Sequence, residues 1–278
     1  MIKSYAKLNL SLRVLKKLKN GLHNLQSNSF LVDLHDKILV KKIKKKKDKI
    51  FTKGKFCKYL NKKENSIIKT LKYLRLKKII SGYYKITITK NIPIFSGLGG
   101  GTSNAAFLTK FFFHKKKINN SIIKNISNIV GSDFPLFFET QVYMKSLNQI
   151  LPFQKKYKLY ILLIFPRFRC STKKIYGKIK SLSKPSKVDY SKSKTKNLFI
   201  ESIKKEKNDL QIVVEQEFPA IKKIIKFIAF QKGCSFSRMT GSGSACFGVF
   251  KNRKFAIEAK NNIKKKYPSY WVKITKTI

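Results

Sequence analysis

The sequence has 278 residues, of which 42% are hydrophobic, and a formal net charge of +50. The apolar fraction excludes a disordered basic tail, and the length suffices for two domains with a core each. The longest apolar run, Leu159–Phe165, is too short to span a bilayer, and the first residues do not form the apolar segment of a signal peptide. The four cysteines form no C-x-x-C pair, which favours free thiols in a reducing compartment. We therefore expect a soluble, cytoplasmic protein without a membrane partner.

The positive charge has two interpretations. A basic surface binds nucleic acids by releasing counterions, so the charge is compatible with a nucleic-acid-binding protein. However, the excess is nearly all Lys and is spread along the whole chain, with one dense run at residues 41–49. It accompanies abundant Ile, Asn, Phe and Tyr, which share A/T-rich codons with Lys, as mutational drift would produce. Drift is the favoured interpretation, with no obligate nucleic-acid partner; a basic nucleic-acid binder is the alternative from a different class of protein.

The first third of the chain predicts strands and one helix. A turn is expected at residues 19–21, and apolar residues recur at helical spacing over 65–76, where Asn65 or Ser66 is a suitable N-cap. Alternating or extended patterns predict strands at 2–16, 29–40 and 84–89.

A glycine-rich stretch, GLGGGTSNAAF, covers Gly97–Phe107 and follows the third of these strands. Glycines lack a Cβ and permit positive φ, so successive amides can turn inward around an anion. A helix expected to begin near Thr102 adds its unpaired N-terminal donors and the positive end of its dipole. The stretch has neither the Gly-Lys-Ser/Thr ending of a Walker loop nor the spacing of a dinucleotide fold. Together with the preceding strand and Pro93, it predicts a phosphate-binding loop.

The remaining pattern divides near residues 145–152. A helix at 121–130 is stopped by Gly131, and the following Ser132–Pro135 is expected to form a non-helical corner. The later expected elements are a strand at 158–165, a loop at 182–197, helices at 209–217, 219–231 and 253–266, a strand-turn-strand at 239–250 and a strand at 270–275. Two α+β domains, 1–148 and 149–278, are predicted.

Five motifs in a fixed order resemble one family. Pro93 followed by GLGGGTS is similar to the ATP loop of the GHMP kinases, and MTGSGSACF resembles their third, C-terminal motif. AKLNL, GLHNLQS and GSDFP, at residues 6–10, 21–27 and 131–135, are similar to the motifs of those GHMP kinases that phosphorylate 4-diphosphocytidyl-2-C-methyl-D-erythritol. The triple glycine and Asn104 fit the same group. The resemblance covers nearly the whole chain.

The resemblance implies a two-domain α+β architecture, with an N-terminal ribosomal-protein-like α/β domain and a C-terminal ferredoxin-like α+β domain. The implied reaction transfers the γ-phosphate of ATP to the 2-hydroxyl of the diphosphocytidyl substrate, giving the 2-phosphate and ADP in non-mevalonate isoprenoid precursor synthesis. ATP and Mg²⁺ are the implied cofactors, the substrate is a small molecule, and a monomer or weak homodimer is expected. Another GHMP kinase, of the homoserine or mevalonate type, is the related alternative.

Two residues are candidates for the chemistry. Asp133 lies on the GSDFP corner among apolar neighbours, in a chain with only 13 acidic residues. A positioned carboxylate can accept the proton of an attacking hydroxyl, although Asp is also common in turns. Lys7 lies in an apolar strand, where a lysine ordinarily extends to solvent. By resemblance, Asp133 is the base, and Lys7 stands beside it to aid proton transfer and steady the transferred phosphoryl group.

The resemblance also assigns binding residues. His23 would hold the cytosine, and Leu22 replaces the tyrosine usual in the family, so it offers no aromatic face to the ring. Ser103 is a candidate Mg²⁺ ligand. The ATP-binding set is Pro93, Ile94, Phe95, Ser96, Gly97, Leu98, Gly99, Gly100, Gly101, Thr102 and Ser103. The substrate-binding set is Asn9, Leu22, His23, Thr172, Gly241, Ser242 and Gly243.

Overall fold

A computed structural model describes residues 1–19, 21–57, 65–114 and 116–278. In chain order its elements are β1 (Ile2–Lys17), β2 (His23–Ile43), β3 (Lys49–Lys53), α1 (Ser66–Leu76), β4 (Tyr83–Thr89), α2 (Gly100–Phe112), α3 (Asn120–Val130), the 3-10 helix η1 (Phe134–Phe138), β5 (Gln141–Ser146), β6 (Gln149–Pro152), β7 (Tyr160–Phe165), α4 (Thr172–Gly177), the 3-10 helix η2 (Tyr190–Lys192), α5 (Lys196–Lys204), α6 (Asp209–Glu217), α7 (Ala220–Ala229), β8 (Cys234–Met239), β9 (Cys246–Phe250), α8 (Arg253–Lys266) and β10 (Trp271–Lys276).

The strands form two sheets. One has the order β3-β4-β2-β5-β6, with β1 paired to β2, and the other has the order β10-β7-β9-β8. The pairing of β3 with β4 is parallel, whereas β2 pairs with β4 and β5 in antiparallel register, as do all neighbours in the second sheet. Helices and strands are interspersed along the chain, and most of these strand pairs are antiparallel. The predicted α+β class is confirmed.

The chain forms two compact units, each made of several segments. The first unit comprises residues 1–7, 34–94 and 99–138, and the second comprises 8–33, 95–98 and 139–278. The division into sequence domains 1–148 and 149–278 stays a prediction. In the part of the chain that the structure describes, no helix is both long and apolar enough to cross a membrane.

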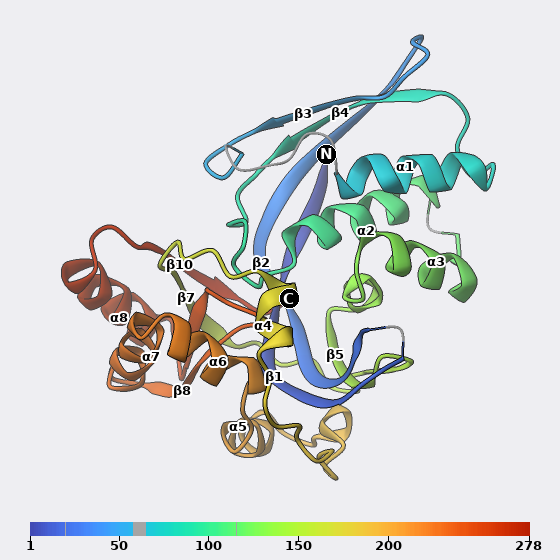
Figure 1. Cartoon of the computed structure of the whole chain (residues 1–278). Coiled ribbons are helices and arrows are strands. Elements are labelled where there is room, and N and C mark those ends of the chain that lie inside the picture. Colours follow the sequence, from blue (N-terminus) through green and yellow to red (C-terminus); the bar gives the residue numbers. More distant parts are fainter. Residues whose placement is uncertain (20, 58–64, 115) are drawn as a thin grey trace. The chain divides into compact units, whose positions relative to one another are not determined.

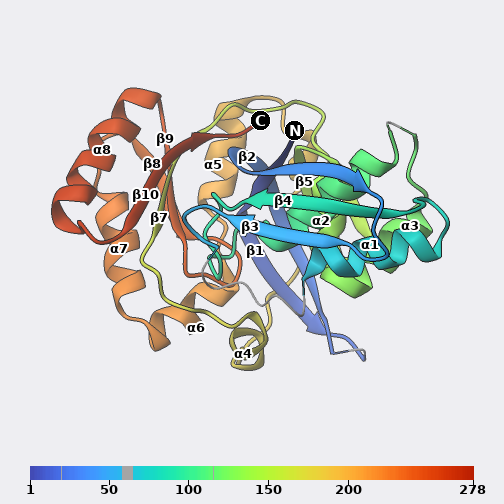
Figure 2. The ribbon, with the colours of Figure 1, turned by 90° about the horizontal axis from the view of Figure 1, so that it is seen from above.

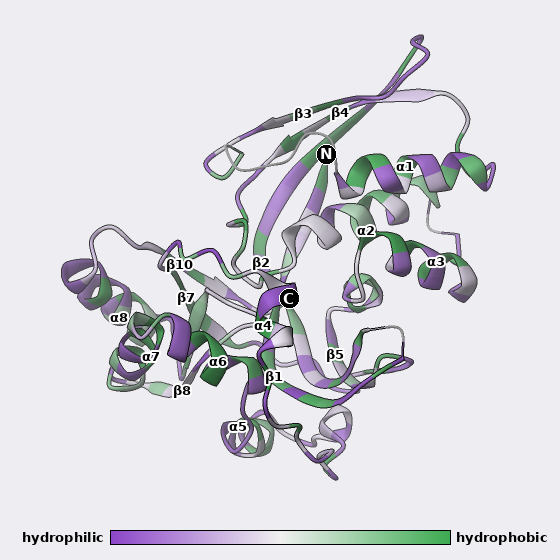
Figure 3. Cartoon of the chain, in the orientation of Figure 1, coloured by the Kyte–Doolittle hydropathy of each residue, from purple (hydrophilic) through white to green (hydrophobic). Residues whose placement is uncertain are grey.

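The first unit is held together by three helices, α1, α2 and α3, with α1 in contact with both of the others (Figure 1). Asn65 is the N-cap of α1, and its side chain accepts from the amide of Ile67, as one of the two predicted caps. The small pair Ala105 and Ala106 is fully buried on α2, which lets a neighbouring helix approach closely. Figure 3 shows the first turn of α2 in a near-white colour, since glycine and hydroxyl residues are neither strongly hydrophobic nor strongly hydrophilic.

The second unit contains the four-stranded sheet, which packs against α7 and α8 (Figure 2). Residues 161–164 of β7 are fully buried, because this strand lies between β10 and β9 and a helix covers it. The apolar stripe of α7 consists of isoleucines at helical spacing, and it is buried against β8 and β9. The sequence predicted α7, α8, β7, β9 and β10 close to their observed bounds, but β8 lies at residues 234–239, before most of the expected strand-turn-strand at 239–250.

Several local predictions were wrong. Helix α2 begins at Gly100, two residues before the expected start, because Gly99 adopts a left-handed φ of 68° and turns the chain into the helix there. The corner at Ser132–Pro135 is only partly non-helical, since its last two residues open η1. Helix α5 begins inside the stretch 182–197 that was expected to be a loop, and α4, β3, β5 and β6 were not foreseen. The expected turn at 19–21 includes residue 20, which lies outside the described residues.

A buried polar network stabilises the second unit. Glu206 accepts two hydrogen bonds from the guanidinium of Arg13, at 2.6 and 2.9 Å, and one from the hydroxyl of Tyr190 at 2.5 Å. Burial raises the pKa of Glu206. The hydrogen bonds from Arg13 and Tyr190 and the positive charges of Arg13 and Arg238 together lower the pKa by more than burial raises it, so it falls below 4.5. The carboxylate therefore ties β1 to the segments around η2 and α5.

We predict that Glu206→Gln lowers the free energy of unfolding by about 2 kcal/mol at pH 7, because the side chain loses its negative charge and its amide nitrogen cannot accept a hydrogen bond from Arg13. A carboxyl group whose pKa is lower in the folded than in the unfolded protein stabilises the fold at pH values above its unfolded-state pKa. This contribution is lost as the pH falls through the folded-state pKa. The variant should therefore lose less stability than the wild type in denaturant titrations run below pH 4.5. Glu201→Gln is the control, because Glu201 is 67% exposed on α5, which ends just before Glu206. An equal acid response in wild type and Glu206→Gln would contradict the prediction.

Candidate active site

Lys7 and Asp133 form an ion pair in the first unit. The Nζ of Lys7, on β1, lies 2.9 Å from the Oδ2 of Asp133, which precedes η1. The Lys7 side chain is 4% exposed, whereas that of Asp133 is 34% exposed. The ammonium is thus buried against a carboxylate that a ligand can still reach. The structure brings together the two residues that the sequence assigned to the chemistry; their roles stay predictions.

The N-terminus of α2 lies beside this pair. A Cβ placed on Gly99 would come within 3.0 Å of the Cγ of Lys7, so the lysine chain lies directly against the loop. A Cβ on Gly131 would be 3.5 Å from the hydroxyl oxygen of Thr102, which brings the GSDFP corner to the same turn of helix. No described side chain caps α2. Its first amides therefore remain available to an anion, next to a buried ammonium group.

In the second unit, residues 95–98 pack against the second glycine motif. The amides of Ser244 and Ala245 donate to the carbonyls of Phe95 and Ser96 at 3.3 and 3.1 Å. A Cβ on Gly97, whose φ is 77°, would lie 2.2 Å from the carbonyl oxygen of Thr240. Since that distance is far below any real contact, only glycine fits. The two motifs thus lie backbone to backbone.

The turn at residues 240–245 is anchored by two asparagines. The backbone amide of Asn9 donates to the hydroxyl of Thr240 at 2.9 Å, and its side-chain amide donates to the hydroxyls of Ser27 and Ser29, both at 2.8 Å. Asn208 donates to the carbonyls of Met239 and Gly241. No sequence motif pointed to Asn208. Asn9 is 2% exposed and joins β1, β2 and this turn; its contact with a substrate stays a prediction.

An aromatic pair marks a second place in this unit. The rings of His23 and Tyr176 stack with centroids 5.1 Å apart and an interplanar angle of 29°. Burial and, to a smaller degree, the positive charge of Lys17 lower the pKa of His23 below 6.5, which favours the neutral imidazole at pH 7. Leu22 is 43% exposed. Tyr176 was missed by the sequence analysis, although it follows Thr172 by one helical turn on α4.

Thr172 lies against the second glycine motif. Its Oγ1 is 2.9 Å from the Oγ of Ser242, so Thr172 and the Gly241–Gly243 turn, both in the expected substrate-binding set, do come together. Thr172 is also the first residue of α4, the helix that carries Tyr176. The hydroxyl pair and the aromatic pair are therefore held by one short helix, at spacing i and i+4.

Phe95 carries backbone strain in the predicted ATP loop. Its φ is 58°, in the left-handed region that is unusual for an aromatic residue, and its side chain is 46% exposed. Ser96 and Leu98 are buried on either side of Gly97, and Pro93 is buried where the loop begins. Such strain occurs where neighbouring contacts fix the chain, here the bonds to Ser244 and Ala245.

Ser103 does not fit the expected role of a Mg²⁺ ligand. It is fully buried, and its hydroxyl bonds to the Oγ of Ser4 at 2.7 Å and to the carbonyl of Tyr5 at 2.6 Å. The described residues contain no cluster of three or more His, Cys, Asp or Glu that could hold a metal ion. Ser103 therefore fastens α2 to β1. The hydroxyl of Thr102, on the preceding residue, is partly exposed at the loop.

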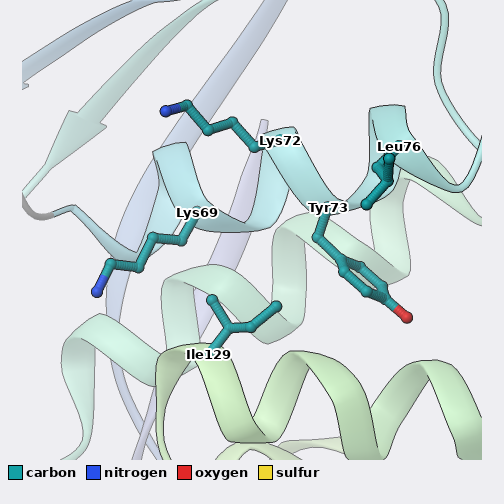
Figure 4. Close-up of a pocket in the computed structure, with 5 residues that line it drawn as sticks. All are labelled: Lys69, Lys72, Tyr73, Leu76 and Ile129. Carbon is teal, nitrogen blue, oxygen red and sulfur yellow. The ribbon is translucent and has the colours of Figure 1, made fainter.

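A shallow hollow of about 500 Å³ lies between α1 and α3 in the first unit (Figure 4). Its lining consists of Lys69, Lys72, Tyr73, Leu76 and Ile129. None of the residues assigned to ATP, substrate or catalysis lines it. Without a carboxylate or a glycine loop, this hollow is not a candidate for phosphoryl transfer.

Family models and solved structures identify the class of protein to which the chain belongs. Residues 65–135 match the family model of the GHMP kinases N terminal domain, and residues 194–269 match that of the GHMP kinases C terminal. Among solved structures, a 4-(cytidine 5'-diphospho)-2C-methyl-D-erythritol kinase has a TM-score of 0.74 at 20% identity and covers 99% of this chain and 98% of its own. A homoserine kinase from Cytophaga hutchinsonii has a TM-score of 0.73 at 17% identity, covering 100% and 94%. The fold is that of the GHMP kinases.

Relatives that match over their full length identify one family within the GHMP kinases. The 4-diphosphocytidyl-2-C-methyl-D-erythritol kinase of Pelagibacter ubique (strain HTCC1062) is 38% identical over 100% of this chain and 98% of its own. The enzyme of that name from Caldanaerobacter subterraneus subsp. tengcongensis is 31% identical over 100% and 96%. The chain belongs to the 4-diphosphocytidyl-2-C-methyl-D-erythritol kinase family.

We predict that Gly97→Ala weakens nucleotide binding at least tenfold, because the new methyl group would displace the Thr240 carbonyl and open the contact between the two glycine motifs. Isothermal titration with a non-hydrolysable ATP analogue measures the effect, and thermal unfolding measures the accompanying strain. Gly177→Ala is the control, since a Cβ there meets no atom within 4 Å. Wild-type affinity in Gly97→Ala would show that this approach is dispensable.

Proposed function

We propose that the chain is an ATP-dependent small-molecule kinase that phosphorylates the 2-hydroxyl of 4-diphosphocytidyl-2-C-methyl-D-erythritol, giving the 2-phosphate and ADP in the non-mevalonate synthesis of isoprenoid precursors. The observation that carries the proposal is the Lys7–Asp133 pair beside the uncapped start of α2. The full-length relatives named for this reaction support the choice of substrate. They favour it over homoserine and mevalonate.

The proposed chemistry uses Asp133 as the base. Its Oδ2 is paired with Lys7, and its side chain is a third exposed, so a hydroxyl can approach the carboxylate. As the hydroxyl oxygen attacks the γ-phosphorus, its proton passes to Asp133 and the β–γ bridging oxygen leaves with ADP. The buried ammonium of Lys7 stabilises negative charge on the transferred phosphoryl group and keeps Asp133 oriented.

The triphosphate is proposed to bind main-chain amides at the start of α2 and in the preceding loop. Gly100 and Gly101 present N–H groups without side chains in the way, and the helix dipole favours the anion. The nucleotide is proposed to arrive as its Mg²⁺ complex, so that the cation belongs to the substrate rather than to a resident site. That choice is consistent with Ser103, whose hydroxyl donates a hydrogen bond to the carbonyl of Tyr5.

The cytidine end is proposed to bind at His23 and Tyr176. A neutral imidazole both donates and accepts a hydrogen bond, which suits the amino and carbonyl groups of cytosine. The tyrosine ring supplies an aromatic face that Leu22 lacks. In this proposal Tyr176 compensates for the missing family tyrosine. Thr172 and Ser242 would hold polar groups further along the substrate.

We also propose a cellular location and an assembly state. The nucleotide substrates are polar metabolites, so we place the enzyme in the cytoplasm, as a monomer or weak homodimer. Size-exclusion chromatography with light scattering, over a range of protein concentrations, tests the assembly state.

An ADP-release assay tests the function directly. Purified protein is incubated with Mg²⁺, ATP and one of three alcohols: the diphosphocytidyl substrate, homoserine or mevalonate. The proposal expects turnover with the first and a background rate with the other two. No turnover on the diphosphocytidyl substrate, or faster turnover on another alcohol, would refute it.

Asp133→Asn should lower kcat by about 1,000-fold, because the amide cannot accept the proton, while the affinity for ATP stays near that of the wild type. Steady-state kinetics and titration with the ATP analogue measure the two quantities. Asp189→Asn serves as a control, because Asp189 lies in the second unit, where it caps η2. Substantial residual turnover in Asp133→Asn would rule out the base assignment.

Tyr176→Leu should raise the KM for the diphosphocytidyl substrate about tenfold, because an aliphatic side chain cannot stack on the base. The kcat at saturation and the KM for ATP should change little. Tyr176→Phe preserves the ring and is expected to behave as the wild type. An unchanged KM in the leucine variant would remove Tyr176 from the proposed cytidine site.

A further inference from the structure

The turn at residues 90–92 joins β4 to the ATP loop and is tied firmly to β2. One oxygen of Asp36, Oδ1, accepts from the backbone amides of Asn91 and Ile92 at 2.8 and 2.9 Å. The other oxygen pairs with the ammonium group of Lys90. The side-chain amide of Asn91 donates to the carbonyl of His35 at 3.0 Å. Asp36 is fully buried and Lys90 is 3% exposed, so these are interior contacts of the first unit.

The opposite side of the turn is fixed by β3. The amide of Lys90 donates to the carbonyl of Lys53 at 2.7 Å. A Cβ on Gly54, whose φ is 99°, would come within 2.8 Å of the carbonyl oxygen of Lys90, so the two backbones touch. In Figure 2, β3 and β4 lie next to each other, and β4 pairs with β2 on its other side. The ends of three paired strands therefore define where the turn lies.

The turn at residues 90–92 also packs against the first residue of α2. A Cβ on Gly100 would be 3.1 Å from the Cγ2 of Ile92 and 3.4 Å from the Nζ of Lys90. A displacement of residues 90–92 would thus move the side chains that support the start of the helix. It would also move Pro93, which follows immediately.

The buried ion pair alone does not explain this arrangement. Burying two charges costs desolvation, and apolar residues of similar volume often stabilise a protein as well. An ammonium near the positive end of a helix dipole is also unfavourable unless a carboxylate neutralises it. What an apolar pair cannot supply is an acceptor for the amides of Asn91 and Ile92. A buried amide without a partner is costly, so the turn would rearrange.

We propose that Asp36 is a positioning residue for the nucleotide. Its Oδ1 holds the amides of Asn91 and Ile92, and this sets the entry of the ATP loop and the start of α2 at the spacing that the triphosphate requires. Lys90 neutralises the carboxylate. The inference rests on the proposed function and adds to it a residue that contacts neither reacting group.

Two double variants isolate the acceptor. Asp36→Asn with Lys90→Met removes the ion pair but keeps a side-chain oxygen for the two amides, whereas Asp36→Ala with Lys90→Met removes that oxygen as well. Because both carry Lys90→Met, any direct effect of the lysine on the nucleotide cancels. The alanine variant should bind the non-hydrolysable ATP analogue about tenfold more weakly than the asparagine variant. The KM for the diphosphocytidyl substrate should be equal in the two.

Asp48→Ala is the matched control. Asp48 likewise joins a cation to the backbone of β4, through Arg75 and the amide of Tyr84, but at the start of that strand. It should lower the temperature of unfolding without changing the dissociation constant for the analogue. Equal constants in the two double variants would overturn the positioning role and leave Asp36 a structural residue. So would a similar loss of affinity in Asp48→Ala.

The binding measurement separates this inference from the proposed function. If the wild type binds the analogue but fails to phosphorylate the diphosphocytidyl substrate, the proposed function fails, and the role of Asp36 is still decided by the ratio of the two constants. If the wild type turns over that substrate while the ratio is one, only the positioning role fails. A wild type that does not bind the analogue overturns both.

Discussion

Close approach of main chain to main chain is the constraint on which the site depends. Gly97 and Gly241 meet where a side chain on either would overlap a backbone atom of the other motif, and Gly99 lies against the chain of Lys7. A Cβ on Gly97 or Gly241 would overlap neighbouring backbone, and a Cβ on Gly99 would be in tight contact with the side chains of Lys7 and Phe137. The absence of a Cβ also leaves the amides at the start of α2 uncovered. A loop shaped in this way by its protein neighbours is preorganised for an anion, which reduces the ordering that binding would otherwise require.

The distribution of carboxylates supports this view of the charge. The chain has 63 Lys and Arg but only 13 Asp and Glu. Three of the few acidic residues bind a cation in the interior or beside the loop: Asp36, Asp133 and Glu206. Most of the lysines that the structure describes lie on exposed positions, where solvent screens them. Ion-paired carboxylates therefore point to the structural centres and to the candidate site better than the net charge does.

Local patterns predicted most elements, and long-range pairing explains the ones they missed. Asn65, the periodic residues of α1 and the stripe of α7 carry their own signals, and the structure confirms them. The short strand β3 reads as a lysine-rich segment, and it exists because it pairs with β4 in parallel. The contact of Lys7 with Asp133 follows from the tertiary fold; the family resemblance, rather than spacing, pointed to it. Asp36 gave no signal, since its partners lie in the turn after β4, more than 50 residues further along the chain.

The proposed cytosine site shows why a single substituted position is a weak guide to function. By sequence alone, Leu22 removes an aromatic ring from a motif that otherwise matches the family. In three dimensions the neighbouring His23 stacks on Tyr176, which comes from α4 and a distant part of the sequence. Stacking requires a π face near the base, not a particular position in the chain. A binding site assembled from two segments can therefore keep its aromatic surface when one segment loses a ring. For this reason the proposed substrate is compatible with Leu22.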